Sequence, residues 1–348
     1  MKSLHIKAIV IITFFISVFI FCKHFKDNSD KETCSHIATK ESLTARGSFS
    51  TDARVTLINI SSTNHPLTSA PSTQPATPAL YVLVTSGNFV HRLGNQLFIC
   101  ASLLGIARKQ NRIPILEDGK DLVKAFEINV GVNKIKATGW DDIHQRMVGI
   151  YEPKFMNLPQ KNVTVSGSLQ SWRFFSHIQD EIRREFTFRP IIQQKTTRFY
   201  NSLRENYTDT VFIGVHVRRA DFLTPDNLKL GFQSPDVAYF TKAFNYMRSI
   251  VSNNTLFIVA SDDLEWCRVN LNHTDVKLLE PDSPENHMSI LSSSDHVIIT
   301  GGSFGWWSAW LARGLKIYFK GFPNPGTKLA KEFNLRDYYP PGWIGLDN

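Results

Sequence analysis

Residues 213–221 read I-G-V-H-V-R-R-A-D, an apolar strand pattern that runs into His216, Arg218, Arg219 and Asp221. Two adjacent guanidinium groups at the end of a buried strand are costly unless they hold an anion. Arginine stays charged at any physiological pH, and its planar fork of donors matches phosphate oxygens. In open α/β sheets, ligands bind beyond the carboxyl ends of the strands. The stretch therefore predicts an α/β fold with a phosphate-bearing ligand, and a nucleotide is the first candidate.

Beyond residue 80 short apolar runs alternate with amphipathic stretches, which is typical of an α/β fold with a parallel sheet. We expect strands at 80–85, 163–165, 211–217, 256–260, 276–279, 296–300 and 316–319. We expect helices at 95–110, 235–251, 264–271, 284–292 and 304–313.

A strand, a glycine turn and a helix follow one another at 296–313. Gly301 and Gly302 allow close backbone approach, and Ser303 is a good N-cap for a helix that continues through Phe304. Free N–H groups and the positive dipole end make such a helix start an anion site. Alternatively, the glycines serve only the turn geometry, and the tryptophans that follow are helix core. The Arg218 strand favours the phosphate site.

A second strand-to-helix turn lies at 81–98, with Arg92, Asn95 and Gln96 near the helix start. It lacks the G-x-G-x-x-G spacing of dinucleotide sites, and the chain has no P-loop, which argues against NAD and ATP. Asn95 is either a ligand contact or a capping residue.

Three further features have two interpretations each. The stretch G-S-L-Q-S-W-R-F-F at 167–175 fits an aromatic platform for a sugar ring or a packed cluster. In S-D-D at 261–263, Asp262 fits a helix cap better than a ligand contact. Asp295, before the last glycine strand, fits a base-reading residue or an ordinary surface carboxylate.

The composition favours anionic partners other than nucleic acid. The 348 residues carry a formal net charge of +8, yet no zinc-knuckle spacing, RNP-type motif or long basic run occurs. The chain also lacks a D-x-D pair for a divalent cation and H-E-x-x-H or C-x-x-C metal spacing. Of the four cysteines, Cys100 and Cys267 fit two buried thiols better than a disulfide.

The first 79 residues differ in character from the rest. An uncharged apolar run at 8–22 fits a signal anchor better than a cleaved signal peptide. The following Ser-, Thr- and Pro-rich stretch cannot bury enough apolar area to fold and predicts an extended stem. Sequons for N-glycosylation favour a luminal face and occur at Asn59, Asn162, Asn206, Asn253 and Asn272.

With these motifs identified, the chain resembles the galactoside alpha-1,2-fucosyltransferase family, glycosyltransferase family 11. The resemblance covers about residues 81–322, and the motifs occur in the family's order: R-L-G-N-Q, Q-S-W, H-V-R-R-x-D, S-D-D and T-G-G-S-F-G-W-W. It implies a GT-B-like fold of two facing Rossmann-like lobes, preceded by one transmembrane helix and a disordered stem. It also implies GDP-L-fucose as donor, no cofactor or metal, and inversion at the anomeric carbon.

The resemblance assigns donor contacts to the second half of the chain. Arg218 would bind the leaving diphosphate, with Arg219 as a second cation or a structural ion-pair partner. His216 and Asp295 would read guanine, and the helix start at 302–304 would donate N–H groups to phosphate.

The resemblance places acceptor contacts in the first half. Asn95 would lie near both donor and acceptor, with Gln170 and Trp172 on the acceptor side. His91 stands where the family has a glycine, and residues 168–169 replace an aromatic, so the acceptor preference is the feature most open to change.

The predicted reaction is attack of the 2-hydroxyl of a terminal β-galactose on fucose C1, opposite GDP. Arginines and the helix start stabilise the charge that develops on the leaving phosphate. Asp221 is the candidate base and Asp226 the reserve, and a proton relayed through water is a third route. The alternative for Asp221 is an ion pair that orients an arginine. Two other functions stay open: a fucosyltransferase acting on an N-glycan core or on protein, and a membrane-anchored glycan-binding protein without turnover.

The predicted organisation has five parts. They are a cytoplasmic tail at 1–7, a transmembrane anchor at 8–22, a luminal stem at 23–79, an acceptor-side lobe at 80–200 and a GDP-fucose-binding lobe at 201–348. We expect a single-pass type II protein of the Golgi membrane that acts on galactose-terminated glycans. A homodimer is left open.

Overall fold

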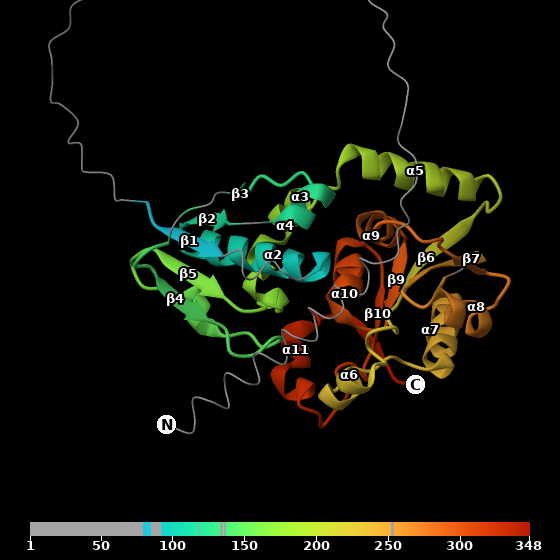
Figure 1. Ribbon diagram of the computed structural model, residues 1–348. Helices are drawn as coiled ribbons and strands as arrows, with labels where there is room; N and C mark the ends of the chain where they lie inside the picture. The colour runs from blue at the N-terminus through green and yellow to red at the C-terminus, as the bar shows by residue number, and fades with distance from the viewer. Residues whose placement is uncertain (1–78, 85–91, 118, 133–134, 136, 252–253) are drawn as a thin grey trace, which may run out of the picture. The chain divides into compact units, whose positions relative to one another are not determined.

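The computed structural model describes residues 79–84, 92–117, 119–132, 135, 137–251 and 254–348 (Figure 1). The predicted tail and membrane anchor, all but the end of the stem, and sequons Asn59 and Asn253 lie outside these residues. Among the residues described, no helix is both long and apolar enough to cross a membrane.

The first lobe is a parallel sheet with its helices. In the described part of the chain the sheet has five strands in the order β3-β2-β1-β5-β4. The strands are β1 (Tyr81–Val84), β2 (Ile113–Leu116), β3 (Gly131–Val132), β4 (Asp141–His144) and β5 (Val163–Ser166). The helices are α2 (Leu93–Lys109), α3 (Lys120–Ala125) and α4 (Gln179–Glu185), with 3₁₀ turns at Pro153–Met156, Trp172–Phe174 and Ser176–Ile178.

The second lobe is also built on a parallel sheet. Its described strands follow the order β11-β10-β9-β6-β7-β8. They are β6 (Thr210–Val217), β7 (Asn254–Ser261), β8 (Val276–Leu278), β9 (His296–Ile299), β10 (Lys316–Phe319) and β11 (Ile344–Leu346). The helices are α5 (Pro190–Arg204), α6 (Pro225–Leu230), α7 (Val237–Ile250), α8 (Leu264–Asn270), α9 (Pro284–Ser292), α10 (Gly302–Leu311) and α11 (Leu335–Tyr338), with a 3₁₀ turn at Leu329–Glu332.

Strand β6 is covered on both faces, as expected for a central parallel strand. Its residues Ile213, Val215 and Val217 join the core formed by α7 and α8. Phe212 packs in a second cluster with residues of α5 and α9. The alternation of a strand therefore directs His216 to the same face as Phe212, toward α10, where its ring contacts Gly305.

The two lobes share one hydrophobic core between α2 and α10. Three tryptophans of α10, Trp306, Trp307 and Trp310, are buried in it. The ring of Phe98 on α2 lies 4.5 Å from that of Trp306. At Gly94 of α2, an added Cβ would lie 2.5 Å from the backbone nitrogen of Phe304, so the helices touch through backbone. The alternative that the tryptophans are helix core is confirmed.

The predicted α/β fold with parallel sheets is confirmed, and each predicted strand and helix is present with ends within about two residues of the expected ones. The predicted lobe boundary at residue 200 falls inside α5, whose Tyr200 and Thr196 bond to α9 through the Ile290 carbonyl and the Ser289 hydroxyl. Cys100 and Cys267 are free and buried, in separate cores, which confirms the expectation of two thiols.

Candidate functional site

The candidate site lies at the carboxyl edge of the second sheet. Strands β6, β7 and β9 are parallel neighbours, so the residues that follow them meet at one edge. The backbone N–H of Arg218, directly after β6, donates to the hydroxyl of the buried Thr300 after β9, at 2.9 Å. This bond ties the arginine motif to the start of the glycine turn, as the two strongest sequence motifs predict.

Arg218 is held by a carboxylate on each arm of its fork. Its Nη2 lies 2.6 Å from Oδ2 of Asp221, and its Nη1 lies 2.9 Å from Oδ2 of Asp262. The side chain keeps 20 % of its surface exposed. The guanidinium is thus fixed in direction, and the side chain remains partly exposed to solvent.

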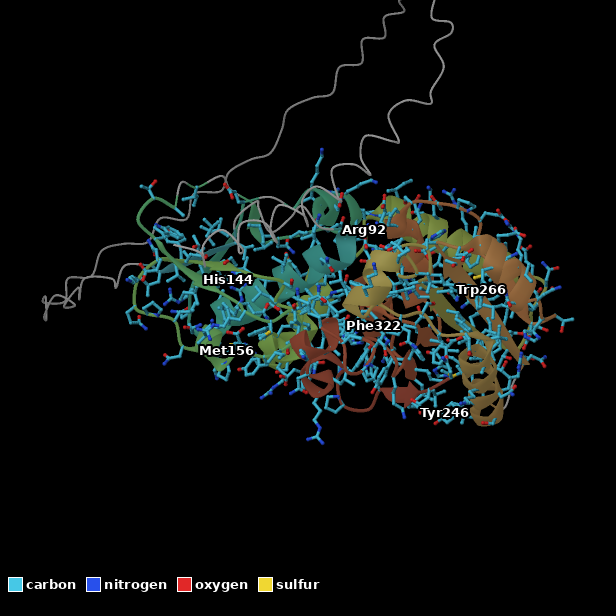
Figure 2. All side chains as sticks on the ribbon, turned by 60° about the horizontal axis from the view of Figure 1, so that its bottom comes forward. Arg92, His144, Met156, Tyr246, Trp266 and Phe322 are labelled. Atoms are coloured by element: carbon cyan, nitrogen blue, oxygen red, sulfur yellow. The ribbon has the colours of Figure 1, made fainter. Side chains whose placement is uncertain are left out.

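Arg219 is occupied by contacts within the second lobe. Its guanidinium lies 3.8 Å from the centre of the Trp266 ring, which is labelled in Figure 2. It also contacts Asp263 at 3.4 Å and donates to the carbonyl of Pro235. These contacts support the structural ion-pair role of Arg219 over that of a second phosphate cation.

The S-D-D motif has a different division of roles from the one expected. Asp263, not Asp262, caps α8, because its side chain accepts from the backbone N–H of Trp266. Asp262 instead pairs with Arg218 and accepts from the backbone N–H of Arg219 at 2.8 Å. The preference for Asp262 as the cap was wrong. Asp262 follows β7, the parallel neighbour of β6, so its carboxylate lies at the same sheet edge as Arg218. This position in the sequence could have indicated the ion pair.

The glycine turn starts α10 two residues earlier than predicted. The N-cap is Gly301, without a side-chain cap, so the assignment of Ser303 as N-cap was wrong. Gly302 has φ of +78°, a left-handed conformation that favours glycine, and a Cβ there would lie 3.3 Å from Cζ of Phe222. The half-buried residues Gly302, Ser303 and Phe304 place their N–H groups in the first turn, where no intrahelical acceptor exists.

The ring of His216 forms an inner wall behind this turn. An added Cβ at Gly305 would clash with Nδ1 of His216, and the Phe304 ring centre lies 5.2 Å from that of the imidazole. Burial, and then the nearby charges of Arg218 and His287, lower the pKa of His216 to about 3. The imidazole is therefore neutral at physiological pH, and it can donate one hydrogen bond and accept another without carrying a charge.

An amide cluster joins the two lobes at the start of α10. Oδ1 of Asn95, on α2, accepts from the hydroxyl of Ser303 and from Nε2 of Gln170, the latter at 3.1 Å. Residues 301–305 also have the G-x-S-x-G spacing of a serine-hydrolase elbow. An amide oxygen is not a base that can activate a hydroxyl, so Ser303 lacks the partner of a nucleophile.

Asp221 lies between two guanidinium groups. Besides Arg218, its Oδ2 contacts Nη1 of Arg92 at 3.6 Å. Arg92 precedes α2 and is labelled in Figure 2; its side chain is 72 % exposed. Sequence reasoning noted Arg92 but gave it no role. Oδ1 of Asp221 is buried and has no hydrogen-bond partner among the described residues. Asp226 is exposed in the first turn of α6.

The structure does not bring Asp295 to this site. Its Oδ2 accepts from the backbone N–H of Phe212, near the beginning of β6, at 2.9 Å. Asp295 precedes β9, so it lies at the amino edge of the sheet, opposite Arg218. The prediction that it reads a base is corrected for this reason.

Trp172 is directed toward the C-terminal segment. Its Nε1 donates to the carbonyl of Arg336 at 3.0 Å, while Gln170, two residues earlier, reaches Asn95. Only Gln170 of the two predicted acceptor residues therefore joins the amide cluster.

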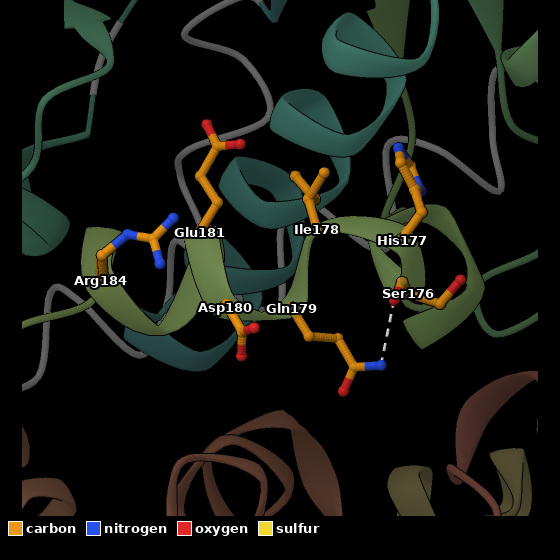
Figure 3. A pocket seen from close by; sticks show the side chains of 7 residues that line it. All are labelled: Ser176, His177, Ile178, Gln179, Asp180, Glu181 and Arg184. Atoms are coloured by element: carbon orange, nitrogen blue, oxygen red, sulfur yellow. Dashed lines mark hydrogen bonds between the residues drawn. The ribbon is translucent and has the colours of Figure 1, made fainter.

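A surface depression of about 540 Å³ lies elsewhere (Figure 3). Its lining runs from Ser176 to Arg184, along a 3₁₀ turn and α4. Arg183 of α4 donates to the carbonyls of Trp310 and Leu311, at the end of α10 opposite the glycine turn. The depression is therefore separate from the candidate site. Among the described residues, no group of three or more His, Cys, Asp or Glu is placed to hold a metal ion.

Residues 55–347 match the family described as glycosyl transferase family 11. The galactoside alpha-(1,2)-fucosyltransferase 2 of Rattus norvegicus is 31 % identical over 74 % of this chain and 75 % of its own length. The galactoside 2-alpha-L-fucosyltransferase SEC1 of Bos taurus is 29 % identical over 73 % of this chain and 72 % of its own. The crystal structure of NodZ alpha-1,6-fucosyltransferase, soaked with GDP-fucose, has a TM-score of 0.49 and 17 % identity, covering 72 % of this chain and 97 % of that chain. The family match over most of the chain shows that it belongs to glycosyl transferase family 11 and is a fucosyltransferase.

Proposed function

We propose that this fucosyltransferase transfers L-fucose from GDP-β-L-fucose to the 2-hydroxyl of a terminal β-galactose, giving an α1,2-fucoside with inversion. The relatives in the rat and in cattle carry galactoside 2-fucosyltransferase names, which supports the acceptor and the linkage. The observation that carries the proposal is the bond between Arg218 N and Thr300 Oγ1, which ties the backbone of the arginine motif to the glycine turn that leads into α10. We also propose that the two lobes, each with its own parallel sheet, form a GT-B-like fold.

The diphosphate of the donor would bind between Arg218 and the first turn of α10. One arm of Arg218 would exchange a carboxylate for a phosphate oxygen, and the amide groups of Ser303 and Phe304 would donate to the same group. These donors are fixed before the reaction, so they stabilise the negative charge that develops on the leaving phosphate. They take the role that a divalent cation has in other transferases, and the reaction is expected to continue in EDTA.

The chemical step breaks the bond between fucose C1 and the phosphate oxygen as the galactose 2-hydroxyl forms a bond to C1 from the opposite face. GDP leaves with the electron pair, and the hydroxyl proton goes to a base. Asp221 is the proposed base, since its Oδ1 has no partner among the described residues, and Asp226 is the reserve. Asn95 and Gln170 would position the acceptor from the first lobe, and His216 would contact the guanine base as a neutral ring.

The test is an incubation of the purified protein with GDP-fucose and a panel of galactosides, N-glycan cores and peptide acceptors, followed by linkage analysis. An α1,2-linked fucose on terminal galactose supports the proposal. Transfer only to an N-glycan core or to a peptide would contradict the acceptor while leaving the fucosyltransferase assignment in place.

We also propose a single-pass type II location in the Golgi membrane, with the catalytic lobes luminal. The apolar run at 8–22 and the sequons support it. Asn206 and Asn272 are exposed, whereas Oδ1 of Asn162 accepts from the Tyr81 N–H. The test is the shift in electrophoretic mobility when an endoglycosidase removes N-glycans. A shift in the wild type that is lost in the Asn206→Gln and Asn272→Gln variants would support a luminal domain. No shift in the wild type would contradict it.

A further inference from the structure

Helix α11 accepts hydrogen bonds from both site-forming motifs. The last carbonyls of a helix lack intrahelical partners, and here side chains from the two lobes supply them. The pairs are Trp172 Nε1 to Arg336 O (3.0 Å), Ser171 Oγ to Asp337 O (2.7 Å) and Trp306 Nε1 to Tyr338 O (2.8 Å). One short segment therefore holds the Q-S-W motif of the first lobe and the tryptophan motif of α10.

The carboxylate of Asp337 adds a charged contact to this brace. It is 4 % exposed, and its Oδ1 lies 2.7 Å from Nη1 of Arg173. Its Oδ2 accepts from the backbone N–H of Tyr151 at 3.0 Å. Arg173 also lies over the Tyr151 ring, at 4.3 Å from its centre. A buried carboxylate thus holds two separate loops of the first lobe.

The turn that leads into the Q-S-W motif needs such support. Gly167 has φ of +122° and Leu169 has φ of +50°, an unfavourable conformation for a leucine. Within the first lobe, a hydrogen bond holds the start of this turn: the Leu169 N–H donates to Oε1 of Gln145 at 2.5 Å. The end of the turn is bound to Asp337: Ser171 Oγ donates to its backbone carbonyl, and Arg173 donates to its carboxylate.

Gln170 lies between these two anchors and reaches the site. Its backbone N–H donates to the carbonyl of Val148 at 3.1 Å, and its side chain donates to Asn95. Asn95 accepts in turn from Ser303 at the start of α10. A change of the Asp337 carboxylate therefore reaches the acceptor side of the site through Arg173 and the turn at 170–173, which includes Gln170.

We infer that Asp337 is a positioning residue for fucose transfer, which fixes the turn at 170–173 and so aims Gln170 at the acceptor. This inference rests on the proposed acceptor side of the site. Asp337 itself touches neither substrate. Its loss changes acceptor use and leaves donor binding intact, since the donor contacts follow β6 and β9 in the second lobe.

The experiment compares the wild type with Asp337→Asn and Ser171→Ala. Asp337→Asn removes the charge that pairs with Arg173, and Ser171→Ala removes one bond to the same segment without a charge change. Steady-state kinetics would give kcat and KM for a galactoside and for GDP-fucose, calorimetry the affinity for GDP, and hydrogen exchange the protection of amides 170–173. The matched control is Asp347→Asn, which breaks an exposed pair with Lys320 near the same chain end.

We expect kcat/KM for the galactoside to fall up to about 100-fold in Asp337→Asn, as for a small misplacement of a positioning group. Ser171→Ala should change it in the same direction, with GDP affinity unchanged and faster exchange of amides 170–173. Equal losses for donor and acceptor, or unchanged exchange at 170–173, would overturn the inference. A wild type that fucosylates no galactoside would instead contradict the proposed function, and the exchange data would still decide the role of Asp337.

Discussion

The hydroxyl of Ser303, in the first turn of α10, donates to Oδ1 of Asn95 in the first turn of α2. Each residue belongs to a different lobe, and the same Oδ1 accepts from Gln170. The start of α10 is therefore oriented by the first lobe as well as by its own strand. This contact makes the proposed donor and acceptor sides parts of one site.

Asn95→Asp tests how close this amide lies to the donor phosphates. The variant keeps the Oδ1 acceptor, replaces the amide nitrogen with a second oxygen and adds a negative charge beside the start of α10. We expect the KM for GDP-fucose to rise about tenfold or more because like charges repel. The matched control, Asn245→Asp on the exposed side of α7, should leave KM unchanged. An unchanged KM in Asn95→Asp would place the phosphates elsewhere.

Gly94→Ala tests the backbone contact between α2 and α10. A Cβ at residue 94 would lie 2.5 Å from Phe304 N and 2.6 Å from Ser303 C, and backbone cannot move aside cheaply. We expect a loss of about 1–3 kcal/mol in the free energy of unfolding, measured with urea. Gly119→Ala should cost far less, since its nearest neighbour is a leucine methyl at 3.7 Å. Equal effects of both substitutions would refute the tight contact.

Substitution of the two adjacent arginines should have different effects: loss of Arg218 should lower kcat, and loss of Arg219 should lower the melting temperature. Arg218→Ala removes the group aimed at the leaving phosphate, and kcat should fall about 100- to 1,000-fold with little change in melting temperature. Arg219→Ala removes the contacts with Trp266 and Asp263, so it should mainly lower the melting temperature. Near-normal kcat in Arg218→Ala would refute its role.

His216 should make the unliganded protein sensitive to acid. Burial lowers its folded-state pKa to about 3, while an unfolded histidine titrates near pH 6.5, so the unfolded state binds the proton first as the pH falls. This contribution to stability is complete above about pH 6.5 and is lost toward pH 3, at up to about 1.4 kcal/mol per pH unit. Urea unfolding between pH 7 and 5 should show a smaller slope with pH in His216→Asn. The same slope in both proteins would contradict a neutral buried ring.

The parallel sheets and the meeting of Arg218 with the glycine turn were predictable because both follow from local patterns. Local sequence predicts both elements: an apolar strand that ends in arginines, and a strand followed by Gly-Gly and a helix. Because the strands are parallel, their carboxyl ends lie at the same edge of the sheet. The same rule, applied to Asp295, would have placed it at the opposite edge, since it precedes its strand.

Other features depend on contacts between distant parts of the chain. Asp337 meets Arg173, which is 164 residues earlier, and no local pattern announces the pair. Helix α5 was missed because its sequence is largely polar and exposed, and it packs mainly through a narrow stripe that includes Thr196 and Tyr200. The different roles of Arg218 and Arg219 depend on Trp266 and on Asp262, which a motif alone does not assign.

The decisive measurement is a crystal structure of the protein with GDP bound, because it locates the diphosphate. We expect the β-phosphate to make hydrogen bonds with the Arg218 guanidinium and with the backbone N–H groups of Ser303 and Phe304. A diphosphate bound away from both elements, with Arg218 still paired to Asp221 and Asp262, would contradict it.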